Sequence, residues 1–340
     1  MKRALFLGGT GTISQSVCAL AARRGWQLTL VNRGSCMDRV PEGAQVLCAD
    51  VRDPDALARV LAGRTFDVVA DFIAFTPDHV RRDMDLFDGR TGQYLFVSSA
   101  SAYQKPLAAL PITESTPLVN PFWQYSRDKI ACEEALNARM RETGFPVTIV
   151  RPSHTYCERK APVALHGTRG NWQVLARMRE GKPTIIPGDG TSLWTATHAS
   201  DFAKGFVGLM GNPRALGSAV HITSDEALSW NRIYEILAGA LGVELNPVHI
   251  ATDFLVACQD EYDLNGDLHG DKCANVLFDN TKIKRLVPDF VCTVSMAEGI
   301  RQAVEYMCAH PECQEPDPVF DRWCDRVCAA YQAGLAAFQA

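Results

Sequence analysis

The chain of 340 residues has no run of basic residues and no long apolar segment. Its formal net charge is −5, and because Lys and Arg form no stripe, nucleic acid is not expected as a main partner. No apolar stretch is long enough to cross a bilayer, which predicts no membrane partner. Glycines interrupt the first apolar run before it reaches the length of a signal-peptide core. These absences predict a cytoplasmic globular protein.

A C-x-x-C knuckle is also missing, although the chain has 12 cysteines. Without a secretion signal these thiols are expected to stay reduced, and most have apolar neighbours that favour packing as small buried side chains. The last four are Cys308, Cys313, Cys324 and Cys328. Their spacing is not that of a zinc site, and Cys324 and Cys328 lie one helical turn apart. We therefore expect no metal.

The first half of the chain alternates between strand-like and helix-like segments. The apolar runs typical of strands cover Ala4–Leu7, Leu28–Val31, Ala44–Cys48, Asp67–Ile73, Tyr94–Val97 and Val147–Val150. Helical patterns lie between them, at Ile13–Arg24, Pro54–Ala62, His79–Asp88 and Ser126–Glu142. Strands rich in Val, Ile and Leu with helices between them indicate βαβ units and a parallel sheet. The pattern predicts an α/β fold with a Rossmann-like, doubly wound parallel sheet.

The second half differs in composition, because Pro, Gly and His become frequent after Arg151-Pro152. We predict a dinucleotide-binding domain over residues 1–155, to which part of 190–225 returns. Residues 156–340 are predicted to form a smaller mixed substrate-binding region with C-terminal helices. The segment Asp317–Gln339 has apolar residues at helical spacing, which fits either a helix docked on the body or a contact in a homodimer.

A glycine-rich loop follows the first strand in the sequence LFLGGTGTIS. Gly8 permits a tight turn, and Gly11 lets the backbone approach a pyrophosphate at the N-terminus of the next helix. Ser14 stands where a third glycine would complete the spacing. Alone, this loop fits a dinucleotide site or a tight turn equally well. Its other candidate contacts are Thr10, Thr12 and Ile13.

The end of the second strand bears on which dinucleotide is bound. A carboxylate there would hold the ribose hydroxyls of NAD, but the strand ends in Asn32-Arg33. A guanidinium suits a phosphate, so Arg33 favours the 2′-phosphate of NADP, although NAD remains open. Asp50 and Val51 follow the third strand and are expected to meet the adenine.

A serine, a tyrosine and a lysine supply a set that can move a proton. Ser99 follows the fifth strand at its carboxyl end, where ligands bind in such folds. Tyr125 and Lys129 are one turn apart on the following helix and share a face. A lysine ammonium near a phenol is expected to lower the pKa of the phenol from about 10. Together they can exchange a proton with an alcohol while a nicotinamide exchanges a hydride.

The motifs together resemble the short-chain dehydrogenase/reductase superfamily, in its extended or atypical branch of NAD-dependent epimerase/dehydratase-like enzymes. Besides the glycine loop, the resemblance rests on an ordered series of motifs over most of the chain. They are ADVRD at Ala49–Asp53, VSSASAY at Val97–Tyr103, YSRDK at Tyr125–Lys129, RPSHTY at Arg151–Tyr156, GDG at Gly188–Gly190, HASDFA at His198–Ala203 and FDNTKIKRLVPDF at Phe278–Phe290.

The resemblance implies a role for each matching residue. Tyr125 would be the catalytic acid/base, Lys129 would bind the nicotinamide ribose and polarise Tyr125, and Ser99 would orient the substrate. Ser98 is a second candidate beside Ser99 and would contact the cofactor. The remaining implied cofactor contacts are Phe72, Ile73, Ala74, Pro152 and His154.

The resemblance implies an NAD(P)-dependent epimerase or oxidoreductase acting on a hydroxyl of a sugar or sugar nucleotide. Trp194 stands where nucleotide-sugar enzymes usually have an arginine for the substrate diphosphate, and Lys182, Arg177 or Arg169 are candidates to replace that cation. An NADP-dependent dehydrogenase or reductase of a non-nucleotide sugar or other alcohol is therefore an alternative. A non-catalytic RNA-binding or regulatory relative of the fold is another. Ala100-Ser101 after Ser99 disfavours a 4,6-dehydratase, which usually has an acidic pair there.

Overall fold

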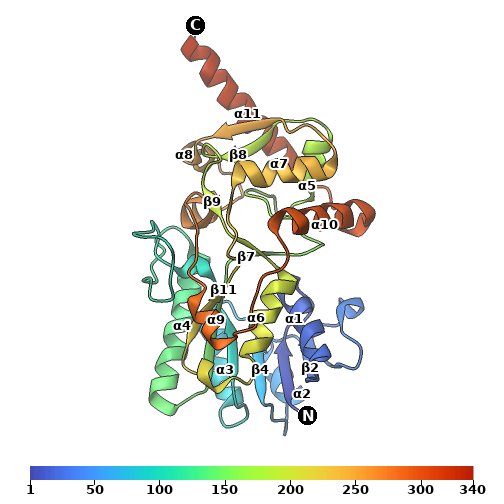
Figure 1. Ribbon diagram of the computed structural model, residues 1–340, viewed down its shortest axis with the longest axis vertical. Helices are drawn as coiled ribbons and strands as arrows, with labels where there is room; N and C mark the ends of the chain where they lie inside the picture. The colour runs from blue at the N-terminus through green and yellow to red at the C-terminus, as the bar shows by residue number, and fades with distance from the viewer. Residues whose placement is uncertain (340) are drawn as a thin grey trace.

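The computed structural model describes residues 1–339, which form a central sheet with helices on both faces (Figure 1). The sheet is parallel and has seven strands in the order β11-β6-β5-β4-β1-β2-β3. The strands are β1 (Arg3–Leu7), β2 (Gln27–Asn32), β3 (Gln45–Cys48), β4 (Val68–Asp71), β5 (Tyr94–Val97), β6 (Val147–Pro152) and β11 (Ala219–Ile222). The predicted α/β doubly wound fold is confirmed. Its strand order reverses between β1 and β4, and such a point opens a crevice at the carboxyl ends of the strands.

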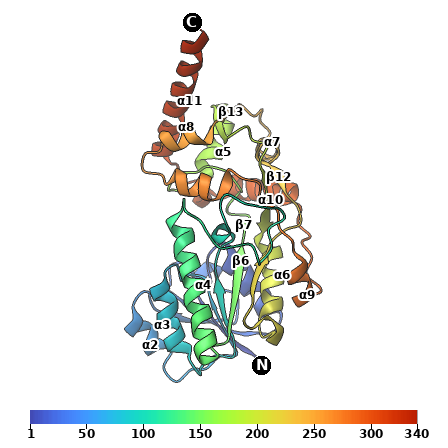
Figure 2. The same cartoon turned by 90° about the vertical axis from the view of Figure 1, so that its left-hand side faces the viewer.

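Two apolar cores lie on the two faces of this sheet, because its central strands are buried on both sides. Ala4 and Phe6 of β1 face one core, and Leu5 and Leu7 face the other. The first core is covered by α1 (Thr12–Arg23), α6 (Ala199–Leu209) and α9 (Thr281–Leu286). The second is covered by α2 (Pro54–Val60), α3 (Pro77–Phe87) and α4 (Gln124–Thr143). Figure 2 shows α3 and α4 on one side of the sheet and α6 on the other.

The start of α1 explains how the loop tolerates a serine in place of the third glycine. Gly11 is the N-cap of the helix, and its backbone N–H donates to the Ser14 hydroxyl over 3.0 Å. Ser14 is only 3% exposed, so its hydroxyl is satisfied inside the loop. The serine therefore replaces a packing glycine with a side chain that caps its own helix.

A third apolar core lies beyond the carboxyl edge of the sheet. Three two-stranded sheets stand there: β7 (His154–Tyr156) with β10 (Ala196–His198), β8 (Thr184–Pro187) with β13 (Pro247–Ile250), and β9 (Leu193–Trp194) with β12 (Leu228–Ser229). The helices around them are α5 (Trp172–Arg179), α7 (Trp230–Leu241), α8 (Thr252–Ala257), α10 (Met296–Ala309) and α11 (Pro318–Gln339). A π-helix, η4, covers Asn265–Lys272. Short 3₁₀ turns are η1 (Met37–Arg39), η2 (Ala100–Ala102), η3 (Pro213–Ala215) and η5 (Pro311–Cys313).

The helix α11 is half buried and half exposed along its length. Phe320, Trp323 and Val327 pack in the third core, together with Cys324 and Cys328. The distal turns project away from the body (Figure 1). No helix within residues 1–339 is long and apolar enough to cross a membrane.

Candidate active site

The glycine loop borders a cavity of about 410 Å³ at the carboxyl ends of β1, β2, β3 and β4. Gly8 adopts φ +74°, a left-handed conformation that glycine accepts without strain. A Cβ on Gly8 would lie 2.8 Å from Cγ2 of Ile73, so a side chain here would clash with the cavity wall. This close approach of backbone and wall is what a dinucleotide loop requires.

Many of the predicted cofactor residues come together at this cavity. Those that line it are Gly8, Thr10, Asn32, Arg33, Asp50, Val51 and Ile73. Gly11, Thr12 and Ile13 form the first turn of α1 next to it. The cavity thus joins loops that follow different strands, and Gly8 and the N-terminus of α1 border it in the way that suits a pyrophosphate.

Three other predicted cofactor contacts lie elsewhere. Phe72 packs between Phe6 and Phe206 at ring distances of 5.5 and 5.2 Å, because its side chain turns into the first core. Ala74 is 1% exposed and offers its carbonyl to Lys129. The Ser98 hydroxyl is buried and donates to Glu133 over 2.5 Å. These side chains therefore serve packing and internal hydrogen bonds in this structure.

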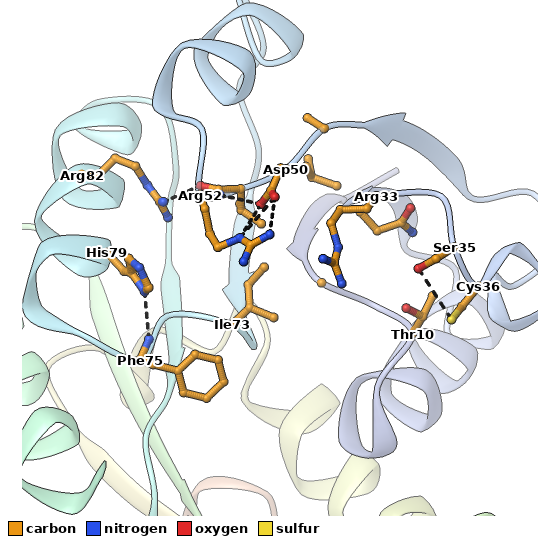
Figure 3. A pocket seen from close by; sticks show the side chains of 15 residues that line it. Thr10, Arg33, Ser35, Cys36, Asp50, Arg52, Ile73, Phe75, His79 and Arg82 are labelled. Carbon is orange, nitrogen blue, oxygen red and sulfur yellow. Dashed lines mark hydrogen bonds and ion pairs between the residues drawn. The ribbon is translucent and has the colours of Figure 1, made fainter. Parts of the chain in front are cut away.

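Four charged residues line the cavity: Arg33, Asp50, Arg52 and Arg82. Figure 3 shows Arg52 paired with Asp50, and Arg33 facing the same space. The Arg52 guanidinium lies 2.6 Å from the Asp50 carboxylate and holds the pKa of that carboxyl well below its usual value. Arg82, from α3, also lines the cavity and pairs with Asp83. Arg33 is exposed and has no carboxylate partner within residues 1–339, so its charge is available to an anionic ligand.

The predicted catalytic tyrosine lies in a second cavity of about 310 Å³. Ser99 and Tyr125 both line it, at the end of β5 and the start of α4, where the Ser99 hydroxyl is close enough to lower the pKa of the phenol. The Ser99 hydroxyl also lies 2.8 Å from the Ser101 hydroxyl, which accepts from Ser126 over 2.8 Å. This chain of hydroxyls fixes the orientation of Ser99. Pro152 and His154 line the same cavity.

The pKa of Tyr125 moves in the opposite direction to the prediction. Burial raises the pKa of its phenol, and the neighbouring Ser99 hydroxyl only partly offsets this effect. The tyrosine also packs against Trp123 and Phe75, at ring distances of 4.9 and 6.3 Å. The phenol is therefore held in its protonated form, which is the form of a general acid.

Lys129 is directed into the protein rather than into either cavity. Its ammonium donates to the carbonyls of Ala74 and Val97 over 2.7 and 2.8 Å, and it lies 5.8 Å from the ring centre of Tyr125. Burial lowers the pKa of this lysine to about 8. In this arrangement Lys129 links the ends of β4 and β5 by hydrogen bonds. Its ammonium interacts with Tyr125 only through the face of the aromatic ring.

Trp194 is a core residue, 1% exposed and stacked on Trp230 at 5.3 Å. The three cations proposed to replace an arginine here are held elsewhere. Arg177 and Lys182 both pair with Asp321, and Arg169 donates to the carbonyl of Pro316. None of the three lines the second cavity.

The cavity has instead two lysines, Lys160 and Lys272, which the motifs did not indicate. It also contains Asp267 and Asp271, from the π-helix, and His166, from the loop before α5. Their segments follow no recognisable motif, so only the folded chain reveals that they share one space.

Comparisons with known proteins show what this chain is similar to. Residues 87–223 match the NAD dependent epimerase/dehydratase family. The chain is thus similar to epimerase/dehydratase-like proteins of the short-chain dehydrogenase/reductase type over this part of its length. The proteins similar to it include a reductase and NAD-dependent epimerases.

Two curated relatives show the range of this similarity. The 2′-dehydrokanamycin reductase of Streptomyces kanamyceticus is 28% identical over 255 residues, which cover 74% of this chain and 70% of the relative. The chloroplast stem-loop binding protein of 41 kDa b from Arabidopsis thaliana is 25% identical over 254 residues, covering 71% of this chain and 64% of the relative. The chain is therefore similar both to a protein named as a reductase and to one named as a binding protein.

Solved structures share the fold at low sequence identity. An epimerase from Methanothermobacter thermautotrophicus superposes with a TM-score of 0.76 at 17% identity, covering 92% of this chain and 93% of that one. The UDP-glucuronic acid 4-epimerase of Bacillus cereus, solved in complex with NAD, gives a TM-score of 0.72 at 17% identity, covering 92% and 100%. The glycine-lined cavity of this chain is thus part of a fold that holds NAD in a neighbour.

Proposed function

We propose that the protein is an NADP-dependent reductase or dehydrogenase that interconverts a ketone and a secondary alcohol on a sugar-like substrate. The observation that carries the proposal is the Tyr125 phenol, which shares the second cavity with the Ser99 hydroxyl. The adjacent glycine-lined cavity supports a dinucleotide, and its unpaired Arg33 supports the 2′-phosphate of NADP.

The chain's own residues would perform the proton transfer. A bound nicotinamide would supply or accept the hydride. Tyr125 would donate its phenolic proton to the substrate oxygen during reduction and take a proton back during oxidation. Ser99 would hold the same oxygen, because its hydroxyl is oriented by Ser101 and lies beside the phenol. Lys129 would stabilise the charge that develops on Tyr125 after proton donation.

A reductase is favoured over in-place epimerisation of a nucleotide sugar by the position of Trp194. A stacked, buried tryptophan offers no charge to a diphosphate, and the nearby candidates Arg177 and Lys182 are committed to Asp321. A free sugar or glycoside needs no diphosphate site. The S. kanamyceticus relative is named as a reductase, which also supports a reductase over an epimerase.

The test is steady-state oxidation and reduction with NADPH, NADH and a panel of keto sugars and sugar alcohols. We expect turnover that prefers NADPH, and a loss of about 10²–10⁴-fold in kcat for Tyr125→Phe. Tyr306→Phe is the matched control, since this tyrosine stacks on His310 in α10 and lines neither cavity. Equal activity of Tyr125→Phe and the control variant would refute the proposal.

The cofactor state of the purified protein separates the two enzymatic alternatives. A reductase exchanges its cofactor at each turnover, so the protein should be purified without it and should consume NADPH stoichiometrically. An epimerase recycles its cofactor in place, so tightly retained NAD(H) would favour epimerisation. Measuring the absorbance of denatured supernatant at the nicotinamide wavelength decides between them.

A non-catalytic role is the second candidate, because one relative is named a stem-loop binding protein. The net charge of −5 gives RNA little electrostatic attraction, which argues against this role. If it held, Tyr125→Phe would leave RNA binding and all cellular function intact.

A further inference from the structure

The second cavity contains several charged residues, and one of them, Lys160, has no ion-pair partner within residues 1–339. Lys272 lies 2.7 Å from both carboxylate oxygens of Asp267. Asp271 has its own partner in Lys105, at 3.9 Å. Lys160 lines the same cavity, yet within residues 1–339 its ammonium forms neither an ion pair nor a hydrogen bond. The charges of the two carboxylates are thus matched before Lys160 is counted.

The backbone holds this lysine in place. Lys160 and Cys157 close a tight turn directly after β7, with the Lys160 N–H donating to the Cys157 carbonyl over 2.9 Å. The neighbouring Arg159 lies 3.9 Å from Glu312 and is thereby paired. The turn therefore places Lys160 at the cavity, whereas Arg159 pairs with Glu312 at a different surface.

The histidines nearby add no compensating charge. Burial lowers the pKa of both His154 and His166, so both rings are neutral at pH 7. The Nδ1 of His166 lies 2.8 Å from the Gly167 carbonyl, and the Nε2 of His154 is buried without a partner. Burial also lowers the pKa of Lys160, which reflects the cost of keeping an unpaired charge there. A ligand that brings a negative charge would relieve this cost.

We infer that Lys160 binds an anionic group of the substrate, a carboxylate or a phosphoryl group, within the cavity that holds Tyr125. This inference rests on the proposed function for the identity of the substrate pocket. It names the substrate as an acidic sugar derivative, whose oxidisable carbon faces Tyr125 while its anion pairs with Lys160. A lysine ammonium bonds either anion as a point charge.

The test measures binding without turnover, so that it does not depend on the catalytic proposal. The Tyr125→Phe full-length protein, with saturating NADP⁺, is titrated calorimetrically with D-glucuronate, D-glucose 6-phosphate and D-glucose. We expect at least one acidic sugar to bind about tenfold or more tightly than glucose, since a hydrogen bond between two charged groups is stronger than one to a neutral hydroxyl. The tighter of the two acids identifies the anion as a carboxylate or a phosphoryl group.

A second variant assigns the effect to the lysine. Adding Lys160→Gln should reduce the affinity for the acidic sugar to that for glucose and leave the affinity for glucose unchanged. Lys284→Gln is the matched control, because this lysine pairs with Asp225 on the surface and lines neither cavity. Equal affinities for acidic and neutral sugars, no binding of either acid, or an unaltered acid affinity in Lys160→Gln would each overturn the inference. Loss of turnover in wild type with intact acid binding would overturn only the proposed reaction.

Discussion

Lys129 shows at the scale of one residue how burial sets the chemistry of a site. Its ammonium satisfies two carbonyls at the ends of neighbouring strands and also lies 4.7 and 4.8 Å from the ring centres of Phe75 and Phe96. These contacts keep a charge inside the protein, but they do not fully replace water, and the pKa falls from 10.5 to about 8. The residue therefore links proton binding to folding.

The pH dependence of stability should reveal this link. Between about pH 8 and 10.5 the unfolded chain keeps a proton on Lys129 that the folded chain has released, so the free energy of unfolding rises with pH through this window. We expect the difference in unfolding free energy between wild type and Lys129→Met to shift in favour of wild type by at most about 3 kcal/mol. Urea titrations at pH 7.5, 9 and 10.5 measure the difference, and Lys284→Met should show no such trend. A flat difference would mean that the pKa of Lys129 is the same in the folded and the unfolded chain.

Single residues also show what the sequence can indicate about the site. Gly8, Arg33 and Asp50 line one cavity, because strand ends in a parallel sheet converge on one edge. Phe72 packs in the first core instead, and the sequence does not show which side of the chain faces the core after a strand ends. Lys160 and Lys272 were missed, because their segments are more than 100 residues apart in sequence and match no motif.

The helix α4 carries two functions on adjacent turns. Tyr125 lies at its first turn, and Lys129 and Glu133 follow at intervals of four residues on a common side. Glu133 is 1% exposed, accepts from Ser98, and pairs with Arg151 of β6. This buried pair anchors the helix against the sheet and so fixes the position of the tyrosine.

Removing the charge of Glu133 should loosen that anchor. Glu133→Gln leaves the Arg151 guanidinium buried without a counterion, and we expect a loss of about 3–5 kcal/mol in unfolding free energy. Glu134→Gln, at an exposed position on the same helix, is expected to change stability by less than about 0.5 kcal/mol. Chemical denaturation followed by circular dichroism compares the two. A loss in Glu133→Gln no larger than in its neighbour would show that the pair contributes nothing to the anchor.

The elements of the sheet were more predictable than those beyond it. Runs of Val, Ile and Leu mark its buried strands, and the glycine loop marks the start of α1. The two-residue strands β9 and β12 and the π-helix have no such signal, because tertiary contacts rather than local patterning determine them. The π-helix supplies Asp267, Asp271 and Lys272 to the second cavity, which is why these charges were not foreseen.

At the scale of the whole molecule, the first part of α11 is packed against the body and its last turns are exposed. Phe320, Trp323 and Val327 pack in the third core, while Leu335 and Phe338 are 49% and 91% exposed. We expect a chain ending after Tyr331 to keep its melting temperature within about 2 °C, because few buried contacts are lost. Trp323→Ala should cost about 3–5 kcal/mol.

Differential scanning calorimetry of the two variants measures both effects. Sedimentation of the shortened chain also tests the predicted homodimer contact, since a dimer held by the exposed distal turns would dissociate. A fall of more than about 5 °C in the melting temperature of the shortened monomer would show that the last turns of α11 support the body.

The path of the chain through the sheet has a practical consequence for building hybrids with its relatives. The segment 199–222 supplies α6 and the edge strand β11, and the segment 281–290 supplies α9 and Phe290 to the first core. Grafting a foreign substrate region as one continuous block after residue 155 would therefore strip the sheet of an edge strand and two of its covering helices. A viable chimera must exchange 156–198, 223–280 and 291–339 as separate inserts and leave the intervening segments native.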